Sequence, residues 1–277
     1  MTSTSTLDPV TRARSAGTGL GAFNVVLLEH AEAIVTGAER AGRPVILQIS
    51  ENCARYHGAF EPIALASLAI ARTAAVPAIV HLDHAEDVDL VHAAVELGVQ
   101  SVMFDGSHLP YDENVATTRA VVEHCHERGV LVEAELGEVG GKDGVHAPGV
   151  RTDPQDAAAF VAATGVDSLA VAVGTSHAMT SRVATVDRDL VASLAEAVGV
   201  PLVLHGSSGL SDDELVGAVR AGMTKINIST HLNGLFTGEV RAALSANDAL
   251  VDPRKYVAPA RAAVADEVER LLRLLAS

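Results

Sequence analysis

Three histidines that lie far apart in the sequence each follow a different apolar run, and such a set could bind a metal ion. His84 ends the run Ile-Val-His-Leu-Asp-His, His177 follows Val-Gly-Thr-Ser, and His205 follows Leu-Val-Leu. Three imidazoles with an open fourth position form a common ligand set of catalytic zinc. A lone histidine at a strand end is more often structural, so the arrangement of the strands must decide between the two interpretations.

Carboxylates stand beside these histidines. Asp83 directly precedes His84, and Asp105 and Glu135 each end a further apolar run. Asp105 and Glu135 could orient the histidines or hold a second metal position. Five other histidines, by contrast, fall in helical or loop patterns and are expected at the surface, namely His30, His57, His92, His124 and His126. His81 is expected to be a buried lining residue.

Short apolar runs alternate with amphipathic helical patterns along the whole chain, and this alternation predicts a parallel sheet. The expected strands are Gly21–Val26, Pro44–Ile49, Ala78–Leu82, Ser101–Asp105, Val130–Ala134, Ser168–Val173, Leu202–Leu204 and Lys225–Ile228. Eight strand–helix units in 277 residues favour a TIM (β/α)₈ barrel, which takes roughly 250 residues, over an open sheet. We expect one domain over residues 1–277, with residues 1–15 as a flexible tail and an additional C-terminal helix over Pro259–Leu275.

The barrel would bring the polar strand ends together, because active sites of this fold lie at the C-terminal ends of the strands. The loop after the seventh strand, Gly206-Ser207-Ser208-Gly209, has the composition of an anion-binding turn. Taken alone it is also an ordinary tight loop. The anion-binding interpretation is favoured because Asn227, Ser229 and Thr230 close the eighth strand, and the loops after strands seven and eight commonly hold phosphate in this fold.

The glycine-rich loop at residues 137–144 could be a mobile lid that carries an acid over a substrate, although a flexible loop without chemistry fits its composition equally well. Lysine is scarce, with only Lys142, Lys225 and Lys255 in the chain. Lys225 begins the expected eighth strand, at the end away from the mouth. Covalent imine chemistry is therefore not expected, and a metal ion would have to supply the electrophile.

The overall composition excludes several kinds of partner. The formal net charge is −15 and no basic stripe occurs, so neither nucleic acid nor an anionic membrane is an expected partner. No apolar run reaches the roughly 18 residues of a membrane span, and the N-terminus has no signal-peptide pattern. The two cysteines lack metal-binding or redox spacing. These features predict a cytoplasmic protein.

Several stretches resemble the class II, metal-dependent ketose-bisphosphate aldolases, which include fructose-bisphosphate and tagatose-bisphosphate aldolases. The resemblance covers nearly the whole chain. It rests on the stretches AFNV at 22–25, HLDH at 81–84, VMFDGSHLPYDENV at 102–115, VEAELGEVGG at 132–141, VGTSH at 173–177, LHGSSGL at 204–210, KINIST at 225–230 and DPRKY at 252–256.

This resemblance implies a reversible retro-aldol cleavage of a phosphorylated ketose to dihydroxyacetone phosphate and an aldehyde. It implies zinc, or another divalent metal, held by His84, His177 and His205, with Asp105 and Glu135 near it. Asp83 would act as the acid and base on the C4 hydroxyl of the sugar. Residues implied at the phosphate end are Asn24, Ser50, Gly206, Ser207, Ser208, Asn227, Ser229 and Thr230. A monovalent cation beside this phosphate, Arg254 on a distal phosphate, and a homodimer or homotetramer are also implied.

The sequence departs from the family pattern at several places. Family members usually have two or more acids after the Gly-Gly of the lid, whereas Lys142-Asp143 follows here, so Asp143 and then Glu138 are the candidates for the second acid. Ala178 stands where the family has glycine, and it could still offer its backbone N–H. Ser229 replaces a common acid. These departures favour a paralogue with an altered substrate, such as a different ketose monophosphate.

Two other functions would require different residues in the sequence. A barrel metallohydrolase would need a His-x-His pair at the first strand, and residues 21–26 contain no histidine. A non-catalytic phosphosugar-binding barrel would keep the scaffold and lose the lid acid. Metal content together with a retro-aldol assay separates this second alternative from an aldolase.

Overall fold

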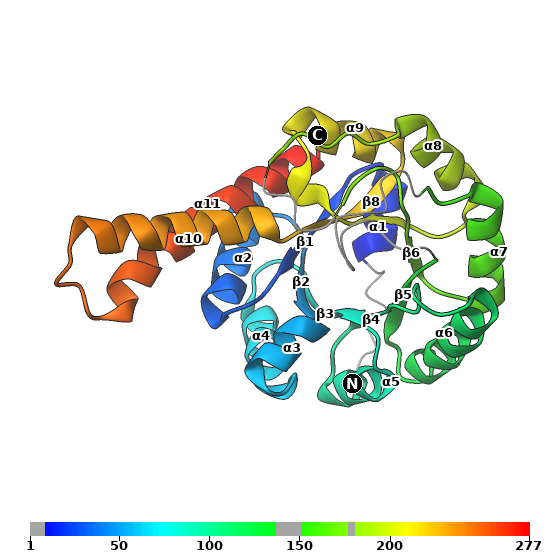
Figure 1. Cartoon of the computed structure of the whole chain (residues 1–277), viewed down its shortest axis with the longest axis horizontal. Helices are drawn as coiled ribbons and strands as arrows, with labels where there is room; N and C mark the ends of the chain where they lie inside the picture. Colours follow the sequence, from blue (N-terminus) through cyan, green and yellow to red (C-terminus); the bar gives the residue numbers. More distant parts are fainter. Residues whose placement is uncertain (1–8, 137–150, 177–180) are drawn as a thin grey trace.

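The chain folds into a closed barrel of parallel strands surrounded by helices, shown as a computed structural model in Figure 1. The structure describes residues 9–136, 151–176 and 181–277. The strands follow one another around the barrel in chain order, and β1 pairs with β8 to close it. They are β1 (Leu20–Asn24), β2 (Val45–Ser50), β3 (Ala78–Ala85), β4 (Ser101–Phe104), β5 (Leu131–Glu135), β6 (Ser168–Ala170), β7 (Leu202–Leu204) and β8 (Met223–Ile228).

Helices form the outer layer and bury their apolar faces against the strands, as expected for this fold. They are α1 (Pro9–Ala16), α2 (Leu28–Ala41), α3 (Glu51–His57), α4 (Glu61–Thr73), α5 (Val88–Leu97), α6 (Tyr111–His126), α7 (Pro154–Thr164), α8 (Arg188–Ala197), α9 (Asp212–Ala221), α10 (Thr230–Ala246) and α11 (Pro253–Leu275), with a 3₁₀ turn η1 (Ser207–Gly209). The predicted TIM barrel and its additional C-terminal helix are confirmed.

The expected flexible tail over residues 1–15 is wrong for its second half. Helix α1 begins at Pro9, and its Val10 and Ala13 are buried. They pack in one cluster with Ile46 and Ile79 at the start of the strands. The two apolar residues are three positions apart and therefore share one helix face, which closes the lower end of the barrel. Residues 1–8 lie outside the described residues.

Helix α3, which the sequence did not predict, follows directly on β2 and borders the mouth of the barrel. The hydroxyl of Ser50 accepts a hydrogen bond from the N–H of Cys53 at 3.2 Å and so caps the helix. The buried carboxylate of Glu51 accepts the N–H groups of Glu86 and Asp87, at 2.7 and 3.3 Å. These contacts tie the end of β2 to the loop after β3.

Helix α10 and the first part of α11 form an arm that projects from the barrel (Figure 1). The remainder of α11 returns to the barrel and packs against α2 and β1, burying Val264, Val268 and Leu272. Within the described residues, no helix is both long enough and apolar enough to cross a membrane.

Replacing Gly37 with alanine is expected to lower the free energy of unfolding by about 1–3 kcal/mol, because a Cβ would overpack the contact between α2 and α11. That Cβ would lie 2.5 Å from the carbonyl oxygen of Ala265 and 2.8 Å from Cβ of Val268. Gly238→Ala is the matched control, since a Cβ at this position of α10 meets no atom within 4 Å. Denaturant unfolding measures both changes. Equal stability of the two variants would contradict the packing described for α2 and α11.

Candidate active site

A bulge in β3 places two neighbouring side chains on the same side of the barrel wall. The pairing of β3 with β4 shifts register between Leu82 and Ala85, and His84 has a left-handed backbone with a φ of 47°. Consecutive residues of a regular strand point to opposite faces, whereas a bulge redirects one of them. Both Asp83 and His84 therefore face the mouth. Non-glycine residues seldom adopt a positive φ, and such strain is concentrated at functional sites.

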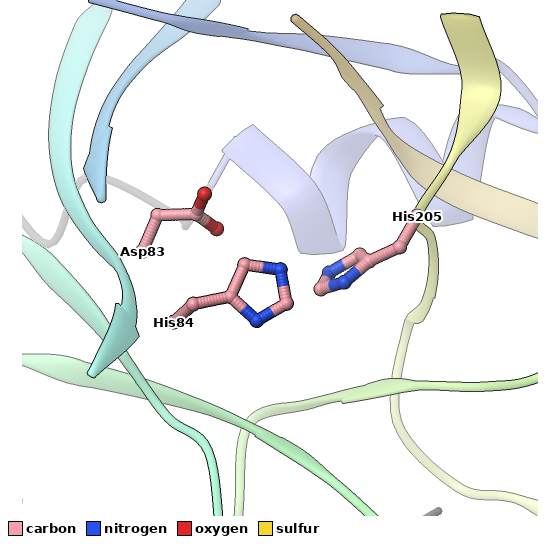
Figure 2. A group of neighbouring side chains, drawn as sticks. All are labelled: Asp83, His84 and His205. Atoms are coloured by element: carbon pink, nitrogen blue, oxygen red, sulfur yellow. The ribbon is translucent and has the colours of Figure 1, made fainter. Parts of the chain in front are cut away.

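Asp83 and His84 meet His205, which follows β7 on the opposite side of the mouth (Figure 2). Each of the three side chains offers one potential ligand atom, and these atoms all lie within 4.8 Å of one another. The two imidazole rings are arranged edge to face, with their centroids 4.6 Å apart. Asp83 and His205 are buried. Two imidazoles and a carboxylate at this spacing could hold a divalent metal.

A second group shares His84 and adds two carboxylates from neighbouring strands. Potential ligand atoms of His84, Asp105 and Glu135 also lie within 4.8 Å of one another. Nδ1 of His84 is 2.7 Å from Oδ2 of Asp105, whose other oxygen accepts the hydroxyl of Ser107 at 2.6 Å. A histidine ligand is commonly oriented in this way by a carboxylate that is itself held by a hydrogen bond.

A cavity of about 180 Å³ opens beside this cluster. The hydrogen bonds along one wall end on Asp83, because Gln48 donates to Asn24 at 2.7 Å and Asn24 donates to Oδ2 of Asp83 at 3.2 Å. Oδ1 of Asp83 is buried and accepts no hydrogen bond from the described residues. The lining residues are Asn24, Gln48, Ser50, Asp83, His84, Gly206, Ser208, Asn227, Ser229 and Thr230.

Comparison with known proteins identifies the family of this chain. Residues 4–277 match the family described as class II fructose-bisphosphate aldolase. The chain belongs to this family. It is similar to the crystal structure of the YdjI aldolase from Escherichia coli K12, at 32% identity and a TM-score of 0.84, over 96% of this chain and 94% of that one.

Two further solved structures share the fold of this class II aldolase. One is a putative fructose-1,6-biphosphate aldolase from Coccidioides immitis, at 29% identity and a TM-score of 0.87, over 99% of this chain and 97% of that one. The other, a fructose-bisphosphate aldolase from Campylobacter jejuni, is 23% identical with a TM-score of 0.80, over 96% and 92% of the two chains, and supports the fold alone. The protein is thus a carbon–carbon lyase of a metal-dependent family that acts on phosphorylated sugars.

The surroundings of the two histidines shift their pKa values in opposite directions. Burial lowers the pKa of His84, but the nearby carboxylates of Asp83, Asp105 and Glu135 outweigh it and raise this pKa to about 9. For His205, burial and the neighbouring His84 hold the pKa well below its ordinary value. Without a metal, the cluster therefore carries its proton on His84.

Metal binding to this aldolase is expected to release a proton from His84, because only the neutral imidazole can coordinate. The affinity for zinc should rise about tenfold per pH unit between the ordinary pKa of 6.5 and the raised value of about 9, and then level off. Titration calorimetry in buffers of different ionisation enthalpy counts the released proton. A zinc affinity that is constant across this interval would contradict the raised pKa.

The structure brings most of the predicted site residues that it describes to the cavity or to the adjoining metal cluster, and some lie elsewhere. Ser207 donates its hydroxyl to the carbonyl oxygen of Leu204 at 3.1 Å and does not line the cavity. Arg254 lies on the arm, 90% exposed, and pairs with Asp252. Four predicted residues lie outside the described residues, namely Glu138, Asp143, His177 and Ala178.

The structure corrects the expected position of His30 and adds two polar residues to the site. His30 is buried and stacks on Phe236, so its predicted surface position is wrong. It follows a short loop after β1, and α10 covers it. Gln48 lines the cavity, and Glu133 contacts His205. The sequence did not single out either residue as part of the site. Their inward-facing positions in the alternation along β2 and β5 were the signal that could have identified them.

Proposed function

We propose that this class II aldolase uses zinc, or another divalent metal, to cleave a phosphorylated ketose into dihydroxyacetone phosphate and an aldehyde. One observation carries the proposal: the buried carboxylate of Asp83 adjoins the imidazoles of His84 and His205 at the edge of a polar cavity. His177 is proposed as the third imidazole ligand, and Asp105 and Glu135 support the metal from the side of β4 and β5.

Asp83 is proposed as the group that takes the proton of the C4 hydroxyl during cleavage and returns it in the reverse reaction. Its Oδ2 is held by Asn24, whereas its Oδ1 accepts no hydrogen bond from the described residues. When bound, the metal supplies Lewis-acid stabilisation of the negative charge that cleavage leaves on the ketose half. A second acid must protonate that carbon, and we propose Asp143 or, failing that, Glu138.

We propose that the phosphate of the dihydroxyacetone half occupies the part of the cavity formed by the loops after β7 and β8. Neither arginine nor lysine lines this cavity among the described residues, so backbone N–H groups and hydroxyls must supply the donors. The N-terminus of α10 lies here at Thr230, and its helix dipole favours an anion at this end of the cavity. Ser208 accepts N–H bonds from Ser229 and His231, which leaves its hydroxyl proton for the ligand.

The projecting arm supports the proposal of a homodimer or homotetramer. Val251, at its tip, is 84% exposed, and Leu244 is 39% exposed. Arg254 sits on the same arm, away from the cavity of its own chain. We propose that Arg254 meets the distal phosphate of a substrate bound to a second copy of this chain. Light scattering of the purified protein tests the assembly.

A panel of ketose monophosphates and bisphosphates, incubated with zinc-loaded protein, tests the proposed reaction. The assay detects dihydroxyacetone phosphate and the aldehyde separately. Formation of both from at least one ketose supports the proposal. Bound zinc with no product from any ketose would instead favour a barrel that binds phosphosugars without cleaving them.

A further inference from the structure

A chain of buried polar groups lies inside the barrel below the metal cluster. Nζ of Lys225 donates to Oε2 of Glu133 at 2.7 Å, and Oε1 of Glu133 is 3.1 Å from Nε2 of His205. On the other side, Nζ of Lys225 is 3.3 Å from Nε2 of His81, and Nδ1 of His81 is 2.8 Å from the hydroxyl of Ser101. Lys225 thus lies in the barrel interior, not at the start of its strand as expected from the sequence.

This position is costly for charged groups. The side chains of Lys225 and Glu133 are 2% and 1% exposed, and the interior of such a barrel is usually filled by branched apolar residues. A buried ion pair is often no more stabilising than well-packed apolar residues of similar volume. A contribution to stability therefore does not explain why these two charged residues are buried here. The contact of Glu133 with His205 indicates a role in the metal site.

The directions of the hydrogen bonds follow from the chemistry of Lys225, because an ammonium group only donates. Nε2 of His81 must accept from it, so Nδ1 of His81 carries the proton that is donated to Ser101. Glu133, as the carboxylate of the ion pair with Lys225, only accepts, so Nε2 of His205 must donate to it. Nδ1 of His205, which lies 3.8 Å from Oε2 of Glu135, is then the ring nitrogen that faces the metal cluster.

We propose that Lys225 and Glu133 are positioning residues that fix the orientation and tautomer of His205, so that its Nδ1 is presented to the metal. The inference rests on the proposed metal site and adds the groups that hold one of its ligands in place. Losing the hydrogen-bond partner of a metal-binding histidine typically weakens metal affinity about 10- to 100-fold.

Two double variants separate this role from a purely stabilising one. Both remove the two buried charges together, so neither leaves an unpaired ion. Lys225→Met with Glu133→Gln keeps an acceptor for Nε2 of His205, because the side-chain oxygen of glutamine can take the place of Oε1 of Glu133. Lys225→Met with Glu133→Leu removes that acceptor at similar volume.

The readout is zinc affinity, measured by competition with a chelator, together with the visible spectrum of the cobalt-loaded proteins. We expect the leucine variant to bind zinc at least tenfold more weakly than the glutamine variant and to show a changed cobalt spectrum. A ratio below tenfold would overturn the proposal, because it would show that the acceptor does not position His205. Circular dichroism checks that both variants fold.

A measurement on the unaltered protein is independent of the variants and of any metal. Long-range ¹H–¹⁵N correlation spectra distinguish the two tautomers of each neutral histidine. The proposal predicts the Nε2–H form for His205 and the Nδ1–H form for His81. An Nδ1–H form for His205 would overturn it, whatever the enzyme's substrate. A protein that binds no zinc but shows the predicted tautomers would instead count against the proposed metal function.

Discussion

Asp83→Asn is expected to lower kcat for retro-aldol cleavage about 10²- to 10⁴-fold, the usual contribution of a positioned acid or base. Asparagine has the same shape as aspartate, and its side-chain oxygen can still accept the hydrogen bond from the side-chain amide of Asn24. It cannot take up the proton of the C4 hydroxyl. Steady-state kinetics with the best ketose of the panel measures the loss.

The zinc content of Asp83→Asn should match that of the unaltered protein, because the proposed imidazole ligands remain. Ser50→Ala is a useful companion variant, since Ser50 lines the same cavity but can neither accept nor release a proton near neutral pH. It should change KM more than kcat. An Asp83→Asn protein that keeps its kcat would show that another group carries the proton.

His205→Ala is expected to lose bound zinc and to fall to the activity of the chelator-treated protein. His205 is fully buried and belongs to the group whose ligand atoms lie within 4.8 Å of one another. Its removal leaves His84 and His177 as the proposed imidazole ligands, one fewer than catalytic zinc sites usually have. Metal analysis after gel filtration, together with kinetics, measures the effect.

Two controls accompany the His205 variant. His126→Ala changes a histidine that is 44% exposed and pairs with Asp167 on the outside of the barrel, so zinc content should not change. Circular dichroism establishes that His205→Ala folds. Full zinc content in folded His205→Ala would remove His205 from the metal site.

The sequence predicted the barrel because its apolar runs and helical patterns alternate along the whole chain. The structure shows the physical basis of one boundary, since the hydroxyl of Ser211 accepts the N–H of Glu214 and caps α9. The sequence also predicted which polar residues meet, since parallel strands place their C-terminal ends at one mouth. Asn24 and Asn227, more than two hundred residues apart, line one cavity for this reason.

Other features depend on geometry that has no sequence pattern. Nothing in the alternation of residues 79–85 predicts the bulge that turns His84 towards the mouth with a positive φ. The sequence pattern places Lys225 at the start of a strand, whereas β8 begins two residues earlier, at Met223. The pairing of Lys225 on β8 with Glu133 on β5 depends on how the strands between them are aligned. Only the closed barrel defines this alignment.

Exchange of a carbon-bound proton of dihydroxyacetone phosphate with heavy water tests the central claim most directly, because it isolates the half-reaction that needs the metal site but not the C4 hydroxyl. The account predicts exchange, followed by NMR, with zinc-loaded unaltered protein and with Asp83→Asn. It predicts none with His205→Ala or after chelation. Undiminished exchange in the metal-free protein, or its complete loss in zinc-loaded Asp83→Asn, would contradict the proposed division of roles between Asp83 and the metal ligands.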